Sequence, residues 1–474
     1  HTYVDVGSVD EPNGQTGIAH MFEHMAFKGT TTIGTQNLQK EMQALKRQEE
    51  IYLELQRERA KGRRADSSRI AELETQFEEA QEEAQSYIAD GEYENLLERN
   101  GVEGLNAYTS PDNTGYLYSL PANKLELFFA LEADRFKNPV LREFYTERDV
   151  VMEERRQRTE SNPAGRLFEE FLTTAFKAHP YGNPTIGHMS DLQNLTRTEA
   201  KRFYDRYYTA SNMTIGIAGD VDPEQVKAYA EEYFSILPAG EEPMPIATEE
   251  PEQIAERRVI IREQSQPWVM VGYHRPSMSS ADAPVYEILN RILSDGRTSR
   301  LYKRLEETGM TLNTGAIDAF PGEKYNTLFA VYSIPSRDVS PDSVEATIYD
   351  VLDRIQEEGV TAEELERAKT QARAQLIGQL DSNMGLARRF SRYEELTGDW
   401  RDLFRRLDEL QSVTADDVQR VAQETFAREN RTVAMIKTSD DSGPTANTSS
   451  DASSSDASSS DASSSDAAAT SASN

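Results

Sequence analysis

Two histidines and a glutamate in the stretch "GIAHMFEHMAF" have the types and the spacing of a metal site with its own base. His20 and His24 are four residues apart, so on a helix they share one face and can present two imidazole nitrogens to one ion. Glu23 directly precedes His24 and can reach a water on that ion. The alternative is a pair of ordinary surface histidines. Since the surrounding residues are almost all apolar, we expect a buried helix, in which these polar side chains need partners.

Zinc held by two histidines needs a third protein ligand and keeps a fourth position open. The chain has no cysteine, so the ligands must be histidines and carboxylates, and a carboxylate from elsewhere in the chain would meet this need. In "FYTERDVVMEERRQR", Glu147 and Glu154 are seven residues apart and share one helical face. We expect Val150 and Val151 to pack between them. Taken alone, a charged, exposed helix is the simpler interpretation of this segment. Two histidines and a carboxylate suit zinc best, although the residues alone do not separate zinc from other divalent ions.

The segment from about residue 38 to 92 predicts two charged helices joined by a turn near Gly62. Apolar residues recur there at steps of three and four, which favours a helical coiled-coil hairpin. A solvated structural spacer is the simpler interpretation of its role. The seam residues are Leu38, Met42, Leu45, Tyr52 and Leu55 in the first helix and Ile70, Leu73, Phe77, Ala80, Ala84 and Tyr87 in the second.

Two distant segments align without a gap, "LTRTEAKRFYDRYYTASNMTIGIAG" from Leu195 and "VTADDVQRVAQETFARENRTVAMIK" from Val413. Each predicts a helix with a Thr cap, a turn containing Asn and an apolar strand, which suggests a duplicated α+β lobe. The Pro- and Glu-rich run after Ile236 would link the lobes. We therefore predict one lobe with the histidine motif at 1–237, a linker at 238–257 and a second lobe at 258–438.

The second lobe mixes apolar strands, "PWVMVGYH" and "TLFAVYSI", with helices. One helix is expected from Ala283 to Leu293, and a longer one opens with a capping box from Thr361 to Glu364. Strands mixed with long helices predict the α+β class, with a mostly antiparallel sheet and helices in each lobe.

The composition is strongly acidic: 82 Asp and Glu against 51 Lys and Arg give a formal net charge of -31 in 474 residues. Such a charge argues against nucleic acid as a partner and is typical of a halophilic-type, salt-tolerant surface. No apolar run is long enough to span a membrane. The Ser-, Asp- and Ala-rich segment 439–474 has too little apolar surface to fold, so we predict a disordered acidic tail.

Several segments together resemble the pitrilysin, insulinase and mitochondrial processing peptidase family, which carries an H-x-x-E-H motif and a distant Glu. They are "GSVDEPNGQTGIAHMFEHMAFKGT", "NAYTSPDNTGYLYSLP", "LEADRFKNP", "ERDVVMEE", "HPYGNPTIG" and "NMTIGIAGDV". The resemblance implies one zinc ion per chain, bound by His20, His24 and Glu154. It also implies that Glu23 is the general base and that Glu147 orients the site.

The resemblance further implies a zinc metalloendopeptidase that holds short or unfolded polypeptides as an added strand inside a closed chamber. Asn106 and Ala107 resemble the edge strand that pairs with substrate. Two alternatives use the same fold: a narrow-specificity processing peptidase subunit and a non-catalytic peptide-binding subunit. The presence of Glu23 and both histidines favours catalysis over the second alternative.

Three departures from the family change the expectations. The interval from His24 to Glu154 is longer than usual by about the length of the hairpin, so we interpret the hairpin as an insertion. Near Glu306 and Leu312, where many active relatives carry a substrate-gripping Arg and Tyr, the required donors are missing. A heterodimer with a zinc-lacking related subunit is therefore expected, ahead of a homodimer. The chain enters midway through an expected strand, so we expect an upstream segment. The compartment stays open, with a periplasmic or other extracytoplasmic location favoured over the cytoplasm.

Overall fold

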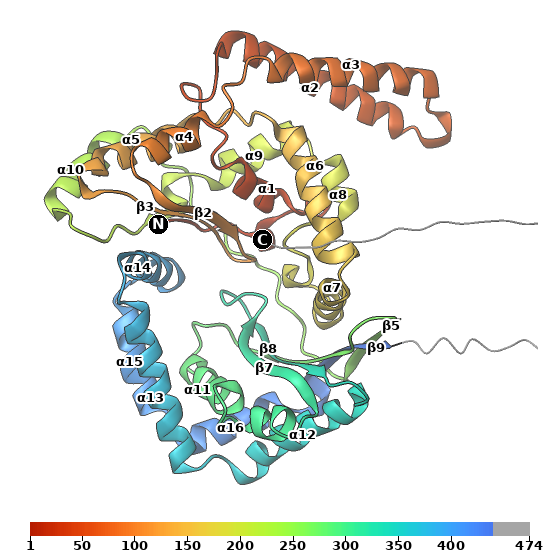
Figure 1. Cartoon of the computed structure of the whole chain (residues 1–474), viewed down its shortest axis with the longest axis vertical. Coiled ribbons are helices and arrows are strands. Elements are labelled where there is room, and N and C mark those ends of the chain that lie inside the picture. Colours follow the sequence, from red (N-terminus) through yellow and green to blue (C-terminus); the bar gives the residue numbers. More distant parts are fainter. Residues whose placement is uncertain (439–474) are drawn as a thin grey trace, which may run out of the picture. The chain divides into compact units, whose positions relative to one another are not determined.

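Two sheets, one in each half of the chain, organise residues 1–438, the part that the computed structural model describes (Figure 1). The first has the strand order β2-β3-β1-β4 and the second β5-β9-β6-β8-β7. Only the pair β5 and β9 is parallel; the other pairs in both sheets are antiparallel. The predicted α+β class with two related lobes is confirmed, and the predicted tail, 439–474, lies outside the described residues. The strands are β1 Thr2–Val4, β2 Glu103–Thr109, β3 Thr114–Ser119, β4 Met213–Ile215, β5 Arg257–Glu263, β6 Trp268–Arg275, β7 Thr311–Phe320, β8 Thr327–Pro335 and β9 Arg431–Thr438.

Helices of the N-terminal lobe cover one face of the first sheet. The motif helix α1 (Ile18–Met25) packs against β2, β3 and α6 (Phe144–Arg155). It buries Ile18, Met21 and Phe22 in an aromatic-rich core, because its apolar residues surround the polar ones as the sequence predicted. The remaining helices of this half are α4 Glu92–Arg99, α5 Leu125–Lys137, α7 Pro163–Ala175, α8 Met189–Asn194, α9 Arg197–Tyr207 and α10 Pro223–Phe234.

The C-terminal lobe has a larger apolar core between its sheet and its helices. The helix expected from Ala283 to Leu293 is α11 (Ala283–Ser294), and the expected capping box at Thr361 opens α13 (Ala362–Gln379). No regular element occupies 238–256, between the two lobes. No described helix is long and apolar enough to cross a membrane. The other helices here are α12 Pro341–Glu358, α14 Asn383–Thr397, α15 Asp402–Ser412 and α16 Ala415–Thr425.

The two segments that align in the sequence have the same local structure. Thr196 and Thr414 each close a capping box at the start of α9 and α16, and a short 3₁₀ turn then leads into β4 and β9. Asn212 donates to the backbone oxygens of Tyr207 and Asp5. Asn430 makes the corresponding pair of bonds to the backbone oxygens of Thr425 and His274. In both lobes the turn asparagine therefore links the end of the helix to an inner strand of the sheet, at the residue after β1 in one lobe and within β6 in the other.

One helix of each lobe packs against the sheet of the other lobe. Helix α7 packs on β5, β6 and β9, whereas α14 packs on β1, β3 and β4 (Figure 1). Phe171 of α7 lies directly over Gly272 of β6, where an added Cβ would come within 2.4 Å of the phenyl ring. The two lobes are thus held together by a reciprocal exchange of helices.

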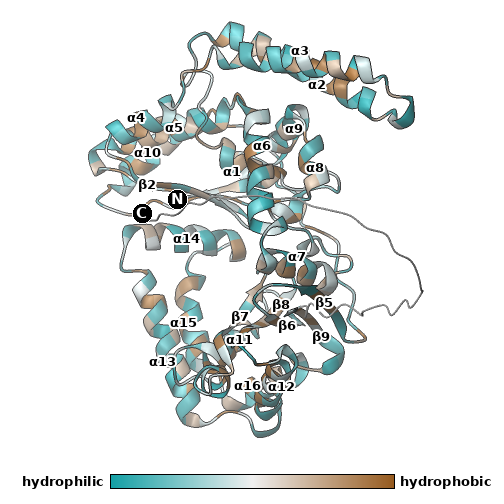
Figure 2. Cartoon of the chain, turned by 45° about the vertical axis from the view of Figure 1, so that its right-hand side comes forward, coloured by the Kyte–Doolittle hydropathy of each residue, from teal (hydrophilic) through white to brown (hydrophobic). Residues whose placement is uncertain are grey.

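The segment expected to be a hairpin forms two packed antiparallel helices, α2 (Leu38–Arg59) and α3 (Ser67–Gln85), with mostly hydrophilic residues on their surface (Figure 2). Tyr52 and Phe77 pack against Tyr145 of α6, so the hairpin shares the core of the N-terminal lobe. Met42 is 41% exposed, and its predicted place in the seam is wrong. The buried stripe of α2 instead runs through Glu41, which binds Arg142, and Leu45.

Candidate active site

The start of α1 is fixed by a carboxylate from outside the helix. Both oxygens of Glu11 accept backbone hydrogen bonds, from Gly17 and Ala19, each at 2.8 Å. Gly17 has a φ of +91° and lies so close to Ile186 and Leu192 that a side chain would collide with them. Burial raises the pKa of Glu11, the two backbone hydrogen bonds oppose that shift, and its carboxyl oxygens satisfy N–H groups that the first turn of the helix leaves unpaired. The motif helix therefore has a defined start and direction.

The predicted ligands His20, His24 and Glu154 come together from α1 and α6. One ligand atom from each lies within 4.8 Å of the others, and they form the one such His, Asp or Glu group found in residues 1–438. Nε2 of His24 is 3.2 Å and Nε2 of His20 is 3.7 Å from Oε2 of Glu154. The longer distance exceeds a hydrogen bond, and Nδ1 of His20 is buried without a hydrogen-bond partner among the described residues. Two imidazoles and a carboxylate with this spacing fit a zinc ion.

The electrostatics also suit a metal site. Burial lowers the pKa of His20 to about 4, which keeps the ring neutral and able to donate a lone pair. Glu147 lies 3.4 Å from Nδ1 of His24, and this hydrogen bond raises the pKa of His24. Burial opposes ionisation of Glu147, but hydrogen bonds from His24 and Lys28 lower its pKa overall. Glu147 therefore holds the ring of His24 with Nε2 toward Glu154.

Glu23 lies beside the three predicted ligands. Its Oε2 is 3.9 Å from Nε2 of His20, and its side chain is 26% exposed. Burial raises its pKa, which makes the carboxylate a stronger proton acceptor than in water. Chemically, this arrangement can bind a metal ion and place a base next to it.

The predicted substrate-binding residues lie on an unpaired strand edge. β2 is the first strand of its sheet and packs against α1. Asn106 and Ala107 pair with Leu117 and Tyr116 of β3 on one side only. The backbone groups on the other side of β2 are available to an added strand.

Two charged neighbours of the site were not predicted. Nζ of Lys28 lies 2.6 Å from Oε1 of Glu147, and Nη1 of Arg158 lies 2.6 Å from Oε1 of Glu154. Each cation follows a residue of the site by four positions, after His24 or after Glu154, and this spacing is a signal that could have found both. The prediction that Val150 packs between the two glutamates is wrong, because only Val151 faces the core and Val150 is 47% exposed.

The C-terminal lobe has a different set of residues in the corresponding place. Helix α11 packs on β7 and α13 as α1 packs on β2 and α6. At the spacing of the motif it carries Glu287, Asn290 and Arg291, and Arg291 donates to Glu287 and to Gln375 of α13. Further on, Glu306 accepts a hydrogen bond from the backbone of Thr314, and Leu312 is 64% exposed. Neither supplies a donor for substrate.

Comparison with known proteins agrees with both lobes. A model described as "Insulinase (Peptidase family M16)" matches residues 2–50 and 82–188, and one described as "Peptidase M16 inactive domain" matches residues 194–372. The chain belongs to the M16 peptidase family. The insulinase model leaves 51–81 of this M16 chain unmatched, which coincides with most of the hairpin.

The M16 chain is 27% identical to the zinc protease PqqE of Helicobacter pylori over 445 residues, 91% of this chain and 86% of the relative. It is 26% identical to an uncharacterised zinc protease, YmfH, of Bacillus subtilis over 361 residues, 73% of this chain and 81% of the relative. A solved protease from Helicobacter pylori superposes with a TM-score of 0.76 at 25% identity, covering 92% of each chain. A Pseudomonas fluorescens "peptidase M16 inactive domain" has the same fold, with a TM-score of 0.72 at 17% identity, covering 94% of this chain and 93% of that one.

Proposed function

We propose that this chain is a zinc metalloendopeptidase that cleaves short or unfolded polypeptides bound as an added strand along β2. The observation that carries the proposal is the convergence of His20, His24 and Glu154 beside Glu23. The names of the curated relatives, zinc proteases, support the same activity.

In this proposal, zinc bound by the three ligands supplies acidification of a water and polarisation of the scissile carbonyl. Glu23 accepts the proton of the attacking water and returns it to the departing amine. Glu147 keeps Nε2 of His24 directed at the site through its contact with Nδ1. The peptide is held mainly by backbone hydrogen bonds to β2 near Asn106 and Ala107, which gives affinity with limited side-chain selectivity.

The working assembly in this proposal has a second subunit. Glu306 and Leu312 leave the C-terminal lobe without the Arg and Tyr grip that the family resemblance led us to expect. A related, zinc-lacking partner that carries those donors completes a closed chamber, and the chamber excludes folded proteins by size.

The first experiment is an assay of the purified chain with zinc on a quenched peptide library, with Glu23→Gln as the control. Glu23→Gln keeps the metal ligands and removes the base. Cleavage that disappears in the control supports the mechanism and shows that the chain acts without a second subunit type. No cleavage by either protein, with zinc bound, contradicts activity of the chain alone and directs the search to a partner. Cleavage at many sites favours general degradation, whereas a single consensus favours a processing peptidase.

A further inference from the structure

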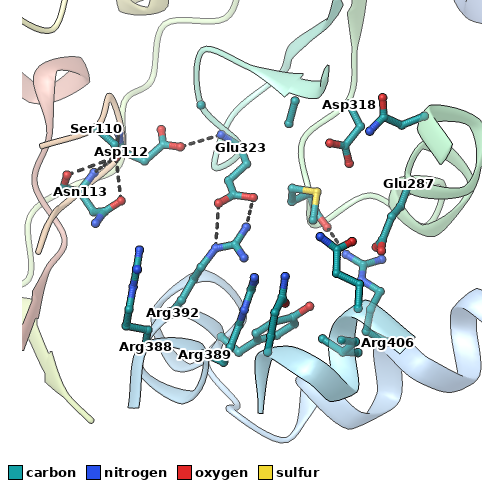
Figure 3. A pocket seen from close by; sticks show the side chains of 18 of the residues that line it. Ser110, Asp112, Asn113, Glu287, Asp318, Glu323, Arg388, Arg389, Arg392 and Arg406 are labelled. Carbon is teal, nitrogen blue, oxygen red and sulfur yellow. Dashed lines mark hydrogen bonds and ion pairs between the residues drawn. The ribbon is translucent and has the colours of Figure 1, made fainter. Parts of the chain in front are cut away.

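A cavity of about 850 Å³ lies between the lobes, next to strand β2 (Figure 3). Tyr108 and the turn at Ser110–Asn113 line one side, and α14 lines another with residues between 385 and 393. The inner ends of α11 and α13 and the loop after β7 complete the wall. None of the four residues predicted to bind or use the metal lines this cavity, so it is separate from the metal site although it borders the same strand.

Most charged groups in the cavity wall already have partners. Glu323 receives two hydrogen bonds from Arg392, one of 2.9 Å, and Glu287 receives one of 3.1 Å from Arg291. Asp112 accepts from the backbone of Glu323 and Lys324. Asp295 pairs with Arg291, Arg406 pairs with Glu409, and burial raises the pKa of Asp318, which faces Arg275.

Arg388 and Arg389 differ from these groups. No carboxylate of residues 1–438 lies within ion-pair distance of either guanidinium, and both side chains rise from α14 into the cavity without a partner in Figure 3. Arg388 lies over the ring of Tyr108, 5.4 Å from its centroid. Burial and the neighbouring Arg392 lower the pKa of Arg389, as expected where positive charge is not neutralised locally. In a chain with a formal net charge of -31, two cavity-lining arginines without a carboxylate partner are suited to bind an anion.

Strand geometry connects these arginines to a peptide on β2. Side chains alternate between the two faces of a sheet, and Ala107 packs toward α1 and its core. Tyr108 therefore lies on the opposite face, the face covered by α14 and Arg388. In an added strand, the residue opposite Tyr108 directs its side chain to that same face.

We propose that Arg388 and Arg389 form a carboxylate-binding subsite that selects peptides with an acidic group opposite Tyr108. The inference rests on the proposed peptide binding along β2 and adds the substrate class. The carboxylate is that of an Asp or Glu side chain or that of the peptide C-terminus, since the chemistry is the same. Guanidinium forks bind either one in a bidentate manner.

The test measures binding of fluorescein-labelled peptides to the zinc-loaded Glu23→Gln protein, which does not need turnover. Each peptide carries Glu, Gln or Lys at one position in turn, with a free or amidated C-terminus. We expect one Glu position to bind about tenfold more tightly than Gln, and Arg388→Gln/Arg389→Gln to abolish that difference. If free-acid peptides alone gain affinity, the C-terminal carboxylate is the ligand.

Two further variants separate recognition from structure. Arg388→Glu/Arg389→Glu should favour the Lys peptide at the same position, which a merely structural role does not produce. Arg405→Gln, an exposed position of α15 outside the cavity, should leave the preference unchanged. Equal binding of Glu and Gln peptides, or an equal loss for both in the double variant, overturns the inference. Failure of the proposed function is a different result, namely no hydrolysis by the wild-type protein of peptides that it binds.

Discussion

The two lobes share the order of four strands, β2-β3-β1-β4 and β7-β8-β6-β9, and the same cap, helix and strand unit, yet only one has the residues of a metal site. In the N-terminal lobe, α1 directs His20 and His24 at Glu154 of α6. In the C-terminal lobe, Arg291 of α11 binds Glu287 of its own helix and Gln375 of α13. Two imidazoles and a carboxylate that converge can bind a metal ion, whereas Arg291 already has acceptors in Glu287 and Gln375. The two lobes therefore share a backbone arrangement, and the identities of three or four side chains determine whether that arrangement can bind a metal ion.

The exchanged helices differ as well. Helix α7 docks mainly through apolar rings, among them Phe168 and Phe171, with one ion pair between Arg166 and Glu263 of β5. Helix α14 docks through polar contacts: Ser391 with His1, and Glu395 with Thr214. An apolar contact does not titrate, whereas a buried carboxylate in a contact makes its strength depend on pH.

The largest expected effect is on catalysis in the N-terminal lobe. Glu23→Gln should lower kcat/KM for a quenched peptide by roughly 10²–10⁴-fold, because the base is removed, while zinc content measured by mass spectrometry stays the same. Asn290→Ala, at the corresponding position of α11, should change kcat/KM by less than about twofold. If both Glu23→Gln and Asn290→Ala lost activity, the result would contradict the proposed difference in function between the lobes.

Next in size is the apolar docking of α7. Phe171→Ala should lower the free energy of unfolding by about 3–5 kcal/mol, because it leaves a cavity against Gly272 and β6. Urea denaturation at pH 5 and pH 8 should give the same loss at both. A loss confined to one pH would contradict the apolar description of this contact.

The third effect concerns the orientation of His24. Glu147→Gln should reduce zinc affinity or activity by roughly 10–100-fold, since it weakens the hydrogen bond at Nδ1. Isothermal titration with zinc measures the affinity, and Glu287→Gln in the other lobe is the matched control. Unchanged zinc affinity in Glu147→Gln argues against an orienting role.

The smallest effect tests the polar docking of α14. Burial, with Asp5 nearby, raises the pKa of Glu395 to about 7. The folded state therefore binds a proton more readily than the unfolded state. The contribution of Glu395 to the free energy of unfolding is present in full below the pKa of the unfolded state and is lost as pH rises through 7. Glu395→Gln should stabilise the protein by roughly 1–2 kcal/mol at pH 8 and by almost nothing at pH 5. Denaturation at both pH values checks this, and a pH-independent change would contradict the assignment.

Local patterns in the sequence were sufficient to predict much of the fold. Capping residues at Thr196, Thr361 and Thr414 marked helix starts that the structure has at the same positions. Such signals are local, because a side chain three residues away satisfies them. Met42 and Val150 were misplaced since the facing surface of a helix depends on distant partners: Arg142 binds Glu41, and Tyr145 packs against Tyr52.

The sequence by itself determined the chemical character of the candidate site. Two histidines four apart on a helix share a face, the absence of cysteine limits the other ligands to histidine and carboxylate, and the family resemblance pointed to Glu154. Only the tertiary structure decided that Glu154 approaches both histidines, that Arg158 contacts it, and that Arg388 from the other lobe faces Tyr108. These residues are brought together by packing between α1 and α6 and by the docking of α14 across the lobes. The positions of the helices relative to one another follow from the filling of the whole core, which no local pattern encodes.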